Sequence, residues 1–378
     1  MIDIKNFKSG TYKQQFQYKS FSPTFINTNW QLSDIDVIIL LSTANIKLGE
    51  LNAFSQLVPD VDFFIKMHIR KEANTSSRIE GTQTNMEDVL QKSENINPEK
   101  KNDWQEVQNY IASMNYAIDN LTKLPLSNRL IKETHKILLD DVRGKHKLPG
   151  EFRSSQNWIG GSSINDAVFI PPHQLDLSDL MSDFEKFIND ENNKLPDLIK
   201  IGIAHYQFET IHPFLDGNGR IGRLLIVLYL VNKGLLLKPC LYLSDFFEKN
   251  KALYYDNLMR TRTHGDLTQW LKFFLEGVRV TAENSVDTFK KVVALKNEVE
   301  TKKIITLGKK TKTAQLLLNY LYTQPLVDTG DIAVNLKINN ATASRLVDDF
   351  LKLNILSEIT GYKRNRIFIF KEYFDIFN

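Results

Sequence analysis

The chain has 378 residues, 42% of them hydrophobic and 25% charged, an ordinary balance for a globular protein that buries a core. A length of this order allows two or three domains. The formal net charge of +3 is close to neutral and argues against a protein that coats nucleic acid, while local basic patches stay allowed. The single cysteine, Cys240, excludes a disulfide framework and a cysteine-based metal cage.

No charged-then-apolar leader pattern opens the sequence. The longest apolar run, Leu224 to Val231, is far too short to span a bilayer. We therefore expect a cytoplasmic protein without a membrane partner.

Helical patterns dominate the first two thirds of the chain. Pro23 and Pro59 bracket one helical candidate at roughly 33–57, and a second helical pattern runs from Val61 to Gly81, a residue suited to a C-terminal cap. A polar stretch, "QKSENINPEKKND", follows. Helical periodicity then continues from about Trp104 to about residue 296.

One segment interrupts the helices. Residues 154–172, "SSQNWIGGSSINDAVFIPP", contain a Gly pair, an Asn-Asp turn signal, a short β-type run and a Pro pair. This composition predicts a small hairpin within a helical domain.

The C-terminal part has a different rhythm. A charged helix and a lysine-rich link lead to Thr313, after which three helix patterns are joined by short turns. An alternating segment that turns at Gly361 follows them, and three helices with a hairpin predict a winged helix-turn-helix. The overall prediction is a mainly α fold.

The stretch "HPFLDGNGRIGR", 212–223, concentrates polar groups between two apolar helical patterns. The N-terminus of the second helix offers free N–H groups and a partial positive charge, so it binds anions. Gly217 and Gly219 let the backbone close around phosphate oxygens, and Asn218 tolerates a left-handed turn. Arg220 and Arg223 lie three apart, which predicts that they project from one helix face and hold phosphate oxygens.

Two further residues of this stretch predict chemistry. Asp216 supplies a hard oxygen ligand, and Mg²⁺ commonly takes one carboxylate together with substrate phosphates. The unperturbed pKa of a histidine lies near neutrality, so a neutral His212 imidazole could accept a proton from an incoming hydroxyl. A nucleotide polyphosphate, a hydroxyl and a base together predict group transfer from phosphorus.

Residues 212–223 match in full the HPFx(D/E)GNGRxxR motif of Fic-domain proteins, and the chain resembles that family over about residues 105–280. Members of the family typically transfer AMP from ATP to a hydroxyl side chain of a target protein. The resemblance implies a Fic-type helical bundle with His212 as the base and Asp216 as the Mg²⁺ ligand. The residues that it implies for nucleotide binding are Gly217, Asn218, Gly219, Arg220, Ile221, Gly222, Arg223, Asn250, Tyr254 and Tyr255.

The resemblance also assigns the predicted hairpin. It corresponds to the flap that receives the target, comprising Ile164, Asn165, Asp166, Ala167, Val168, Phe169 and Ile170. An exposed strand edge can take an extended segment as an added strand and so direct its hydroxyl to His212.

A second motif points to regulation. The stretch "SSRIEG", 76–81, fits the (S/T)xxxE(G/N) inhibitory motif of family members with an N-terminal regulatory helix. A Glu80 carboxylate paired with Arg223 would occupy the guanidinium that the γ-phosphate needs and would repel that phosphate. Ser76, one turn earlier, could support Glu80 by a hydrogen bond.

The resemblance divides the chain into four parts. These are an N-terminal helical region carrying the inhibitory helix (1–104), a catalytic domain (105–282), a helical linker (283–312) and a winged helix domain (313–378). The expected partners are ATP, a target with a Ser, Thr or Tyr hydroxyl, the protein itself as a target, and a second copy in a homodimer.

Other functions stay open. The same site could remove AMP from a modified protein or transfer another nucleotide or phosphate-containing group. Alternatively, the chain could be a DNA-binding regulator that senses nucleotide. Residues Asn340, Thr342, Ser344 and Arg345 suit groove contacts and "GYKRNR" suits phosphates, whereas Asp348 and Asp349 on the same helix would be repelled by DNA.

Overall fold

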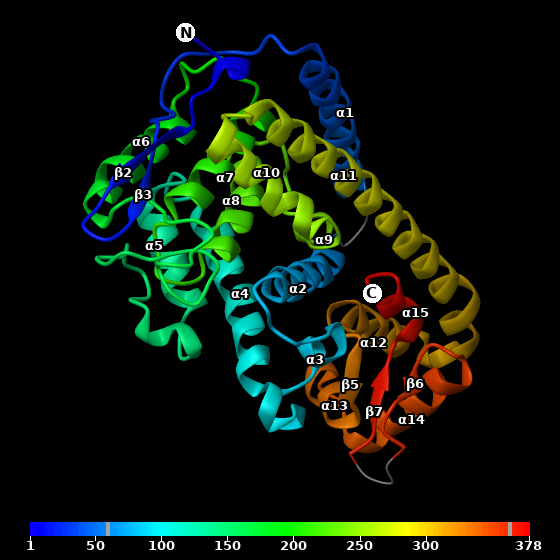
Figure 1. Cartoon of the computed structure of the whole chain (residues 1–378). Helices are drawn as coiled ribbons and strands as arrows, with labels where there is room; N and C mark the ends of the chain where they lie inside the picture. Colours follow the sequence, from blue (N-terminus) through cyan, green and yellow to red (C-terminus); the bar gives the residue numbers. More distant parts are fainter. Residues whose placement is uncertain (58–60, 362–364) are drawn as a thin grey trace.

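The computed structural model describes residues 1–57, 61–361 and 365–378 (Figure 1). Two central helices, α7 (Asp197–Ile211) and α8 (Asn218–Asn232), lie inside a layer of other helices. Every residue of α7 after Asp197 is buried. A helix that is apolar nearly all round requires such a central position, and the loop 212–217 joins the two central helices.

Short strands and three helices make up the N-terminal part. They are β1 (Ile2–Asp3), β2 (Gly10–Gln14), β3 (Lys19–Pro23), β4 (Trp30–Gln31), α1 (Ile35–Leu57), α2 (Val61–Ile79) and α3 (Met86–Leu90). The two long helices match the predicted ones. The sequence analysis missed the strands, because β2 is mostly exposed and lacks the alternation of a half-buried strand.

The remaining helices of the middle part surround α7 and α8. They are α4 (Lys101–Asn120), α5 (Asn128–Leu138), α6 (Leu177–Asn189), α9 (Ser244–Lys249), α10 (Lys251–His264) and α11 (Leu267–Glu298). Helix α4 runs across residue 104, α11 runs across residue 282 and α12 (Thr311–Thr323) runs across residue 312, so all three predicted domain limits fall inside helices. The four-part division itself stays a prediction.

Helix α1 packs along α11 (Figure 1). Its buried residues, Val37, Leu41, Ala44, Leu48, Leu51 and Ser55, recur at intervals of three and four and form one stripe. Within the described part of the chain, α1 is the one helix long and apolar enough to cross a membrane by length and composition. The search for an apolar run missed it because polar residues interrupt it. Core helices pass the same test, so the absence of a membrane partner stays a prediction.

The C-terminal module, residues 311–378, contains α12 (Thr311–Thr323), β5 (Leu326–Asp328), α13 (Thr329–Leu336), α14 (Asn340–Lys352), β6 (Ser357–Glu358), β7 (Ile367–Ile369) and α15 (Lys371–Asp375). Its strands form an antiparallel sheet in the order β5-β7-β6. The three predicted helices and two predicted strands are present, and β5 is an addition. The predicted basic turn includes residues 362–364, which lie outside the described residues. DNA binding at α14 stays a prediction.

The predicted hairpin at 154–172 is mostly irregular. Within this segment, all of which the structure describes, one antiparallel bridge joins Ile159 to Phe169. The Phe21 amide of β3 donates to the Ile170 carbonyl at 2.9 Å, so the N-terminal hairpin β2–β3 adjoins this segment. We call residues 157–172 the flap.

Candidate active site

The loop between α7 and α8 is shaped by the ends of both helices. His212 is the C-terminal cap of α7 and has left-handed backbone angles, φ 50° and ψ 61°. Gly217 caps the N-terminus of α8 with φ 76°, a conformation that favours glycine. The free N–H groups at the start of α8 therefore follow shortly after His212 and can bind an anion.

The side chain of Asn218 bonds to the loop that precedes it. Its Oδ1 accepts a hydrogen bond from the Phe214 amide and its Nδ2 donates to the Phe214 carbonyl, both at 2.8 Å. The left-handed turn that the sequence analysis assigned to Asn218 is found at Gly217 instead, because Asn218 is already the first residue of α8. Asn218 closes the loop.

Two buried side chains that the sequence analysis did not identify hold the His212 carbonyl. Arg153 Nε donates to this carbonyl at 3.0 Å, and Asn157 Nδ2 donates to it at 3.3 Å and to the Phe214 carbonyl at 2.9 Å. Arg153 also donates to the Pro172 carbonyl. The two residues therefore tie the base of the flap to the catalytic loop.

His135 of α5 holds the backbone of Asp216. His135 Nε2 lies 2.9 Å from the Asp216 carbonyl, and the His135 ring stacks on Phe214 with 3.7 Å between centroids. The Asp216 side chain is 43% exposed and lies beside the N-terminus of α8. One exposed carboxylate at an anion-binding helix end suits Mg²⁺ that completes its ligands with phosphate oxygens and water. Among the described residues, no cluster of three or more His, Cys, Asp or Glu side chains could hold a metal by itself.

The two arginines make separate contacts. Arg220 is buried and lies 3.3 Å from Glu106 of α4 and 3.5 Å from Asp216. Glu106 also accepts a hydrogen bond from Arg143 at 2.7 Å. Glu106 and Arg143 lie outside the motif, so the sequence analysis did not identify them. Arg220 therefore lies close to the metal-ligand candidate.

Arg223 contacts the C-terminal end of α2. Its Nη2 lies 2.7 Å from Glu80 Oε1 and 2.9 Å from the Ser76 carbonyl, while its Nε donates to Ser76 Oγ at 2.8 Å. The Arg223 side chain is 2% exposed. The structure thus brings Glu80 and Ser76 to Arg223, although Ser76 contacts the guanidinium and not the Glu80 carboxylate.

The electrostatics of this pair favour the ionised forms. Burial alone would raise the pKa of Glu80, but the charge and hydrogen bond of Arg223 outweigh it and hold the pKa below its usual value. A Cβ atom at Gly219 would collide with Glu80 Oε1. The Glu80 carboxylate therefore lies directly against the glycine backbone at the start of α8.

His212 is held neutral by its surroundings. Burial lowers its pKa to about 3, and the charges of Arg262 and Arg153 act in the same direction. Its Nδ1 is buried, with no hydrogen-bond partner in the described part of the chain. A neutral imidazole at pH 7 is the form that can accept a proton.

A further carboxyl group, Glu209, lies one turn before His212. It is 7% exposed, and burial raises its pKa to about 7. Its Oε1 has no hydrogen-bond partner among the described residues, and a Cβ atom at Gly222 would collide with it. Glycine at position 222 therefore leaves room for this carboxyl group.

The residues predicted for the adenine side lie at the junction of α9 and α10 and on α10. Asn250 lies between these helices and donates to the Phe246 carbonyl. Tyr254 is buried with its hydroxyl 2.9 Å from His205 Nε2, whereas Tyr255 is 41% exposed. Lys251 donates to the Ile79 carbonyl at 2.7 Å and so joins α10 to the end of α2. Nucleotide contact at Asn250, Tyr254 and Tyr255 stays a prediction.

The flap residues differ in exposure. Val168 is 67% exposed, whereas Phe169 is buried beneath the Arg262 guanidinium, 4.1 Å from its ring centroid. Asp166 accepts hydrogen bonds from the amides and hydroxyls of Ser162 and Ser163, which lower its pKa and close the tip of the loop. Target binding by the flap stays a prediction.

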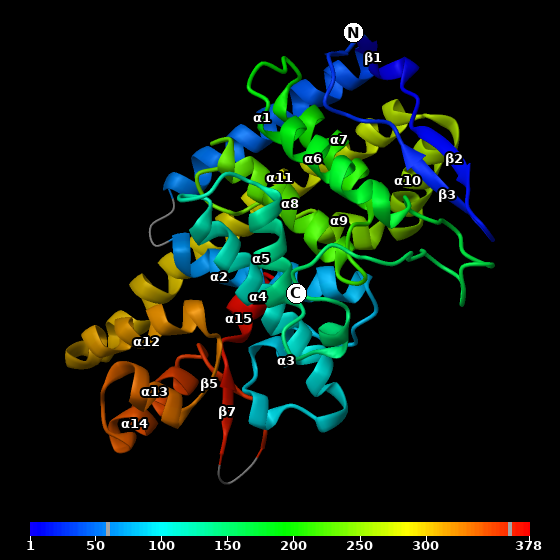
Figure 2. The ribbon, with the colours of Figure 1, turned by 90° about the vertical axis from the view of Figure 1, so that its left-hand side faces the viewer.

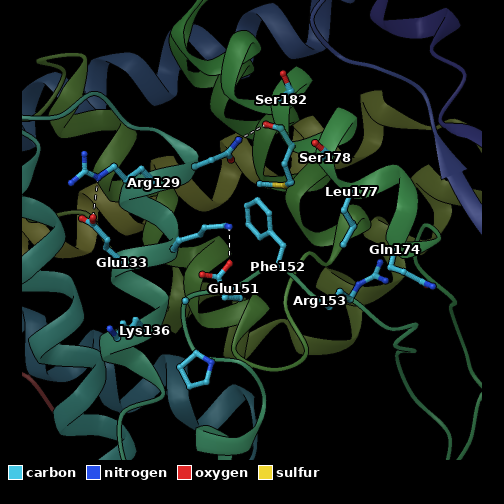
Figure 3. A pocket seen from close by; sticks show the side chains of 15 residues that line it. Arg129, Glu133, Lys136, Glu151, Phe152, Arg153, Gln174, Leu177, Ser178 and Ser182 are labelled. Atoms are coloured by element: carbon cyan, nitrogen blue, oxygen red, sulfur yellow. Dashed lines mark hydrogen bonds and ion pairs between the residues drawn. The ribbon is translucent and has the colours of Figure 1, made fainter.

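A wide hollow of about 860 Å³ lies on the other side of α5, against α6 (Figure 3). Ion pairs Arg129–Glu133 and Lys132–Glu151 cross its wall, and Phe152 is at its centre in this view. Residues 212–223 do not line it. The hollow adjoins the loop that carries His212 through Arg153, which lines the hollow and donates to the His212 carbonyl.

These features define a helical protein in which the N-terminus of a central helix lies beside a buried histidine. Residues 38–119 match the family model "Fic/DOC family N-terminal" and residues 125–230 match "Fic/DOC family". The chain belongs to the Fic/DOC family.

Named relatives agree with this assignment. The chain is 31% identical over 165 residues to "Protein adenylyltransferase Fic" of Drosophila grimshawi and 32% identical to the same protein of Drosophila mojavensis. Each alignment covers 43% of this chain and 30% or 29% of the relative. The chain thus spans less than a third of the length of these relatives.

Solved structures show the same fold. A Fic family protein from Desulfovibrio desulfuricans G20 superposes with a TM-score of 0.57 at 19% identity, over 90% of this chain and 98% of that one. Fic-1 (aa134–508) from C. elegans superposes with a TM-score of 0.50 at 20% identity, over 68% and 73%. The Fic fold therefore extends beyond the segments that the family models match.

Proposed function

We propose that the chain transfers AMP from ATP to a hydroxyl side chain of a target protein, and that Glu80 restrains this reaction. The observation that carries the proposal is the loop 212–223. It places the His212 ring at the end of α7, beside the glycine-lined N-terminus of α8, with Arg223 engaged by the Glu80 carboxylate. The names of the relatives support AMP transfer.

In this proposal the neutral His212 imidazole accepts the proton of the target hydroxyl. A bond forms between that oxygen and the α-phosphorus, the bond from the α-phosphorus to the bridging oxygen breaks, and pyrophosphate leaves. The amides of Asn218 and Gly219 at the start of α8 bind phosphate oxygens, and Asp216, whose Oδ1 accepts a hydrogen bond from the Gly217 amide at 2.6 Å, would hold Mg²⁺. When bound, the metal neutralises phosphate charge.

Inhibition follows from the Glu80–Arg223 contact. The Glu80 carboxylate lies at the start of α8, where it would compete with a bound anion. It also pairs with the Arg223 guanidinium, with 2.7 Å between Glu80 Oε1 and Arg223 Nη2. Removing Glu80 frees Arg223 for the γ-phosphate. The proposal includes self-modification, and it includes a homodimer. The outer face of α1 supports a homodimer, because Ile35, Ile39 and Ile46 are exposed there.

The test uses purified protein and labelled ATP. Glu80→Gly should raise incorporation of α-phosphate label into protein at least about tenfold, because the part-buried charged hydrogen bond between Arg223 and Glu80 is removed. Adding His212→Ala should abolish incorporation. Label from the γ-phosphate instead would show phosphoryl transfer, and release of AMP from a modified protein would show the reverse reaction. If the rate of label incorporation is unchanged in the Glu80→Gly protein, the proposed inhibition by Glu80 is wrong.

A further inference from the structure

Helix α2 carries Ser76 in its last turn, is followed directly by Glu80, and contacts the C-terminal module with its earlier turns. The Phe64 ring packs edge-on against Tyr322 of α12 at 5.4 Å between centroids. One turn later, the His68 ring packs edge-on against Phe377 at 5.1 Å. These side chains are all buried, so the module forms an apolar wall for the first half of α2.

Polar contacts fasten the same junction. Arg70 Nη2 donates to Gln324 Oε1 at 2.9 Å, and Nη1 of the same guanidinium donates to the Thr323 carbonyl. Gln324 in turn donates to the Leu90 carbonyl of α3 at 2.7 Å. Lys92 lies 2.7 Å from both Asp328 and Asp331 of the module.

The opposite side of α2 rests on the catalytic part. Glu72 accepts hydrogen bonds from Tyr110 of α4 and Ser244 of α9, and the Ile79 carbonyl accepts one from Lys251 of α10. Helix α2 is therefore enclosed between the catalytic helices and the C-terminal module (Figure 1).

The enclosure is incompletely filled. A cavity of about 100 Å³ lies at the junction and is lined by side chains of α2, α9, α11 and the C-terminus, including His68, Lys71, Phe246, Ser285 and Phe377. The buried His68 Nε2 has no hydrogen-bond partner in the described part of the chain. Space and an unsatisfied polar atom both lower the cost of moving α2 at this place.

We propose that the C-terminal module is a clamp on the inhibitory helix, so that loosening the module releases Glu80 from Arg223. This proposal rests on the proposed function for its consequence. Phe64 and Glu80 are 16 residues apart, and an α-helix is stiff over the corresponding length of about 24 Å, so a shift of the first half moves the last turn. Without the module, Phe64 and His68 would face water and α2 would lose one of its two supports.

The experiment substitutes residues of the C-terminal module and measures amide hydrogen exchange at the end of α2. Gln324→Ala removes the partner of Arg70 and of the Leu90 carbonyl, and Phe377→Ala removes the ring against His68. Each should speed amide hydrogen exchange at residues 76–80 by at least about fivefold, the lower end of measured coupling between sites. Each should also raise incorporation of α-phosphate label into protein. The control is Leu316→Ala on α12, where the side chain is 54% exposed.

Two results would overturn the clamp. One is exchange at 76–80 unchanged in both variants while residues of the module exchange faster. The other is a full additional rate gain when Gln324→Ala is added to Glu80→Gly, since a clamp acting through Glu80 has nothing left to release. Amide hydrogen exchange does not depend on catalysis. An inactive Glu80→Gly protein would therefore refute the proposed function, while the exchange measurement would still decide whether the module clamps α2. If Phe377→Ala fails to fold, Gln324→Ala alone decides.

Discussion

His212 has an uncommon backbone conformation for a residue other than glycine, with φ 50°. Hydrogen bonds from Arg153 and Asn157 to its carbonyl oppose the strain, and the buried ring lacks a partner for Nδ1 among the described residues. A strained residue held by fixed donors keeps its ring in one place, which suits a base that must meet an incoming hydroxyl.

Glu209 and Gly222 form a matched pair at the residue scale. Gly222→Ala should destabilise the protein by about 1–3 kcal/mol, because the added methyl group collides with a buried carboxyl group. In a Glu209→Ala background the methyl group has space, so the same change should cost far less. Urea unfolding of the four proteins measures both effects.

The control for this cycle is Gly49→Ala in α1. A Cβ atom there meets nothing within 4 Å, so the change should be neutral or stabilising by up to about 1 kcal/mol. Equal costs of Gly222→Ala with and without Glu209 would show that the collision has no energetic consequence.

The sequence could predict the site only within the motif and the inhibitory stretch. The loop 212–223 has a residue pattern with a physical reason, whereas Glu80 was identified through the resemblance to the family's inhibitory motif. The fold brings the two together. Glu106 and Arg153 lie far from the loop in sequence, and their residue types are ordinary for a helix face or a surface loop. Only tertiary packing directs them to Arg220 and to the His212 carbonyl.

At the scale of elements, the flap and the catalytic loop are joined at the flap base. Asn157 donates from Nδ2 to two carbonyls, those of His212 and Phe214. Asn157→Asp replaces that donor by an acceptor and leaves two buried carbonyls facing a carboxylate, a loss of about 1–3 kcal/mol. When Asn157→Asp is added to the Glu80→Gly protein, we expect incorporation of the α-phosphate label to fall at least about fivefold.

The matched control for this change is Asn192→Asp, the same substitution at an exposed position outside the flap. It should leave ATP affinity and incorporation nearly unchanged. If both aspartate variants lose activity equally, the added charge causes the loss and the hydrogen bonds to the loop do not.

Elements with a strong period were predictable and those without it were not. The helices α1 and α2 follow from apolar spacing and from Pro23, Pro59 and Gly81. Strands β2 and β3 pair with each other while β2 stays exposed, so no alternation marks them. The flap was predicted as a hairpin, yet its turn signals produce one bridge, because Arg153 and Asn157 bond to the neighbouring loop instead of a strand partner.

At the scale of the whole molecule, several histidines are buried in their neutral form. Burial lowers the pKa of His68, of His205 and of His212 to about 3 in each case. In the unfolded chain these groups bind protons near pH 6.5. Between pH 6.5 and pH 3 the unfolded state therefore holds more protons, so stability falls as the pH falls through this window. Glu209, with a pKa raised to about 7, acts in the opposite direction between pH 7 and pH 4.5.

Burial lowers the pKa of His135 as well, to about 4, and raises the pKa of two further carboxyl groups, Glu72 and Asp183. The four histidines outnumber these three carboxyl groups, so we expect the free energy of unfolding to drop between pH 7 and pH 5.

His68 is the residue to change, because its ring lies between Phe289 and Phe377 and its Nε2 has no partner among the described residues. His68→Phe keeps a ring in place and removes the titration, so it should reduce the drop by about 2 kcal/mol, which is 1.5 pH units at 1.36 kcal/mol each. Urea unfolding at both pH values measures it, with the exposed His146→Phe as control. An equal drop in the His68→Phe and His146→Phe proteins would mean that acid destabilises the fold through other groups.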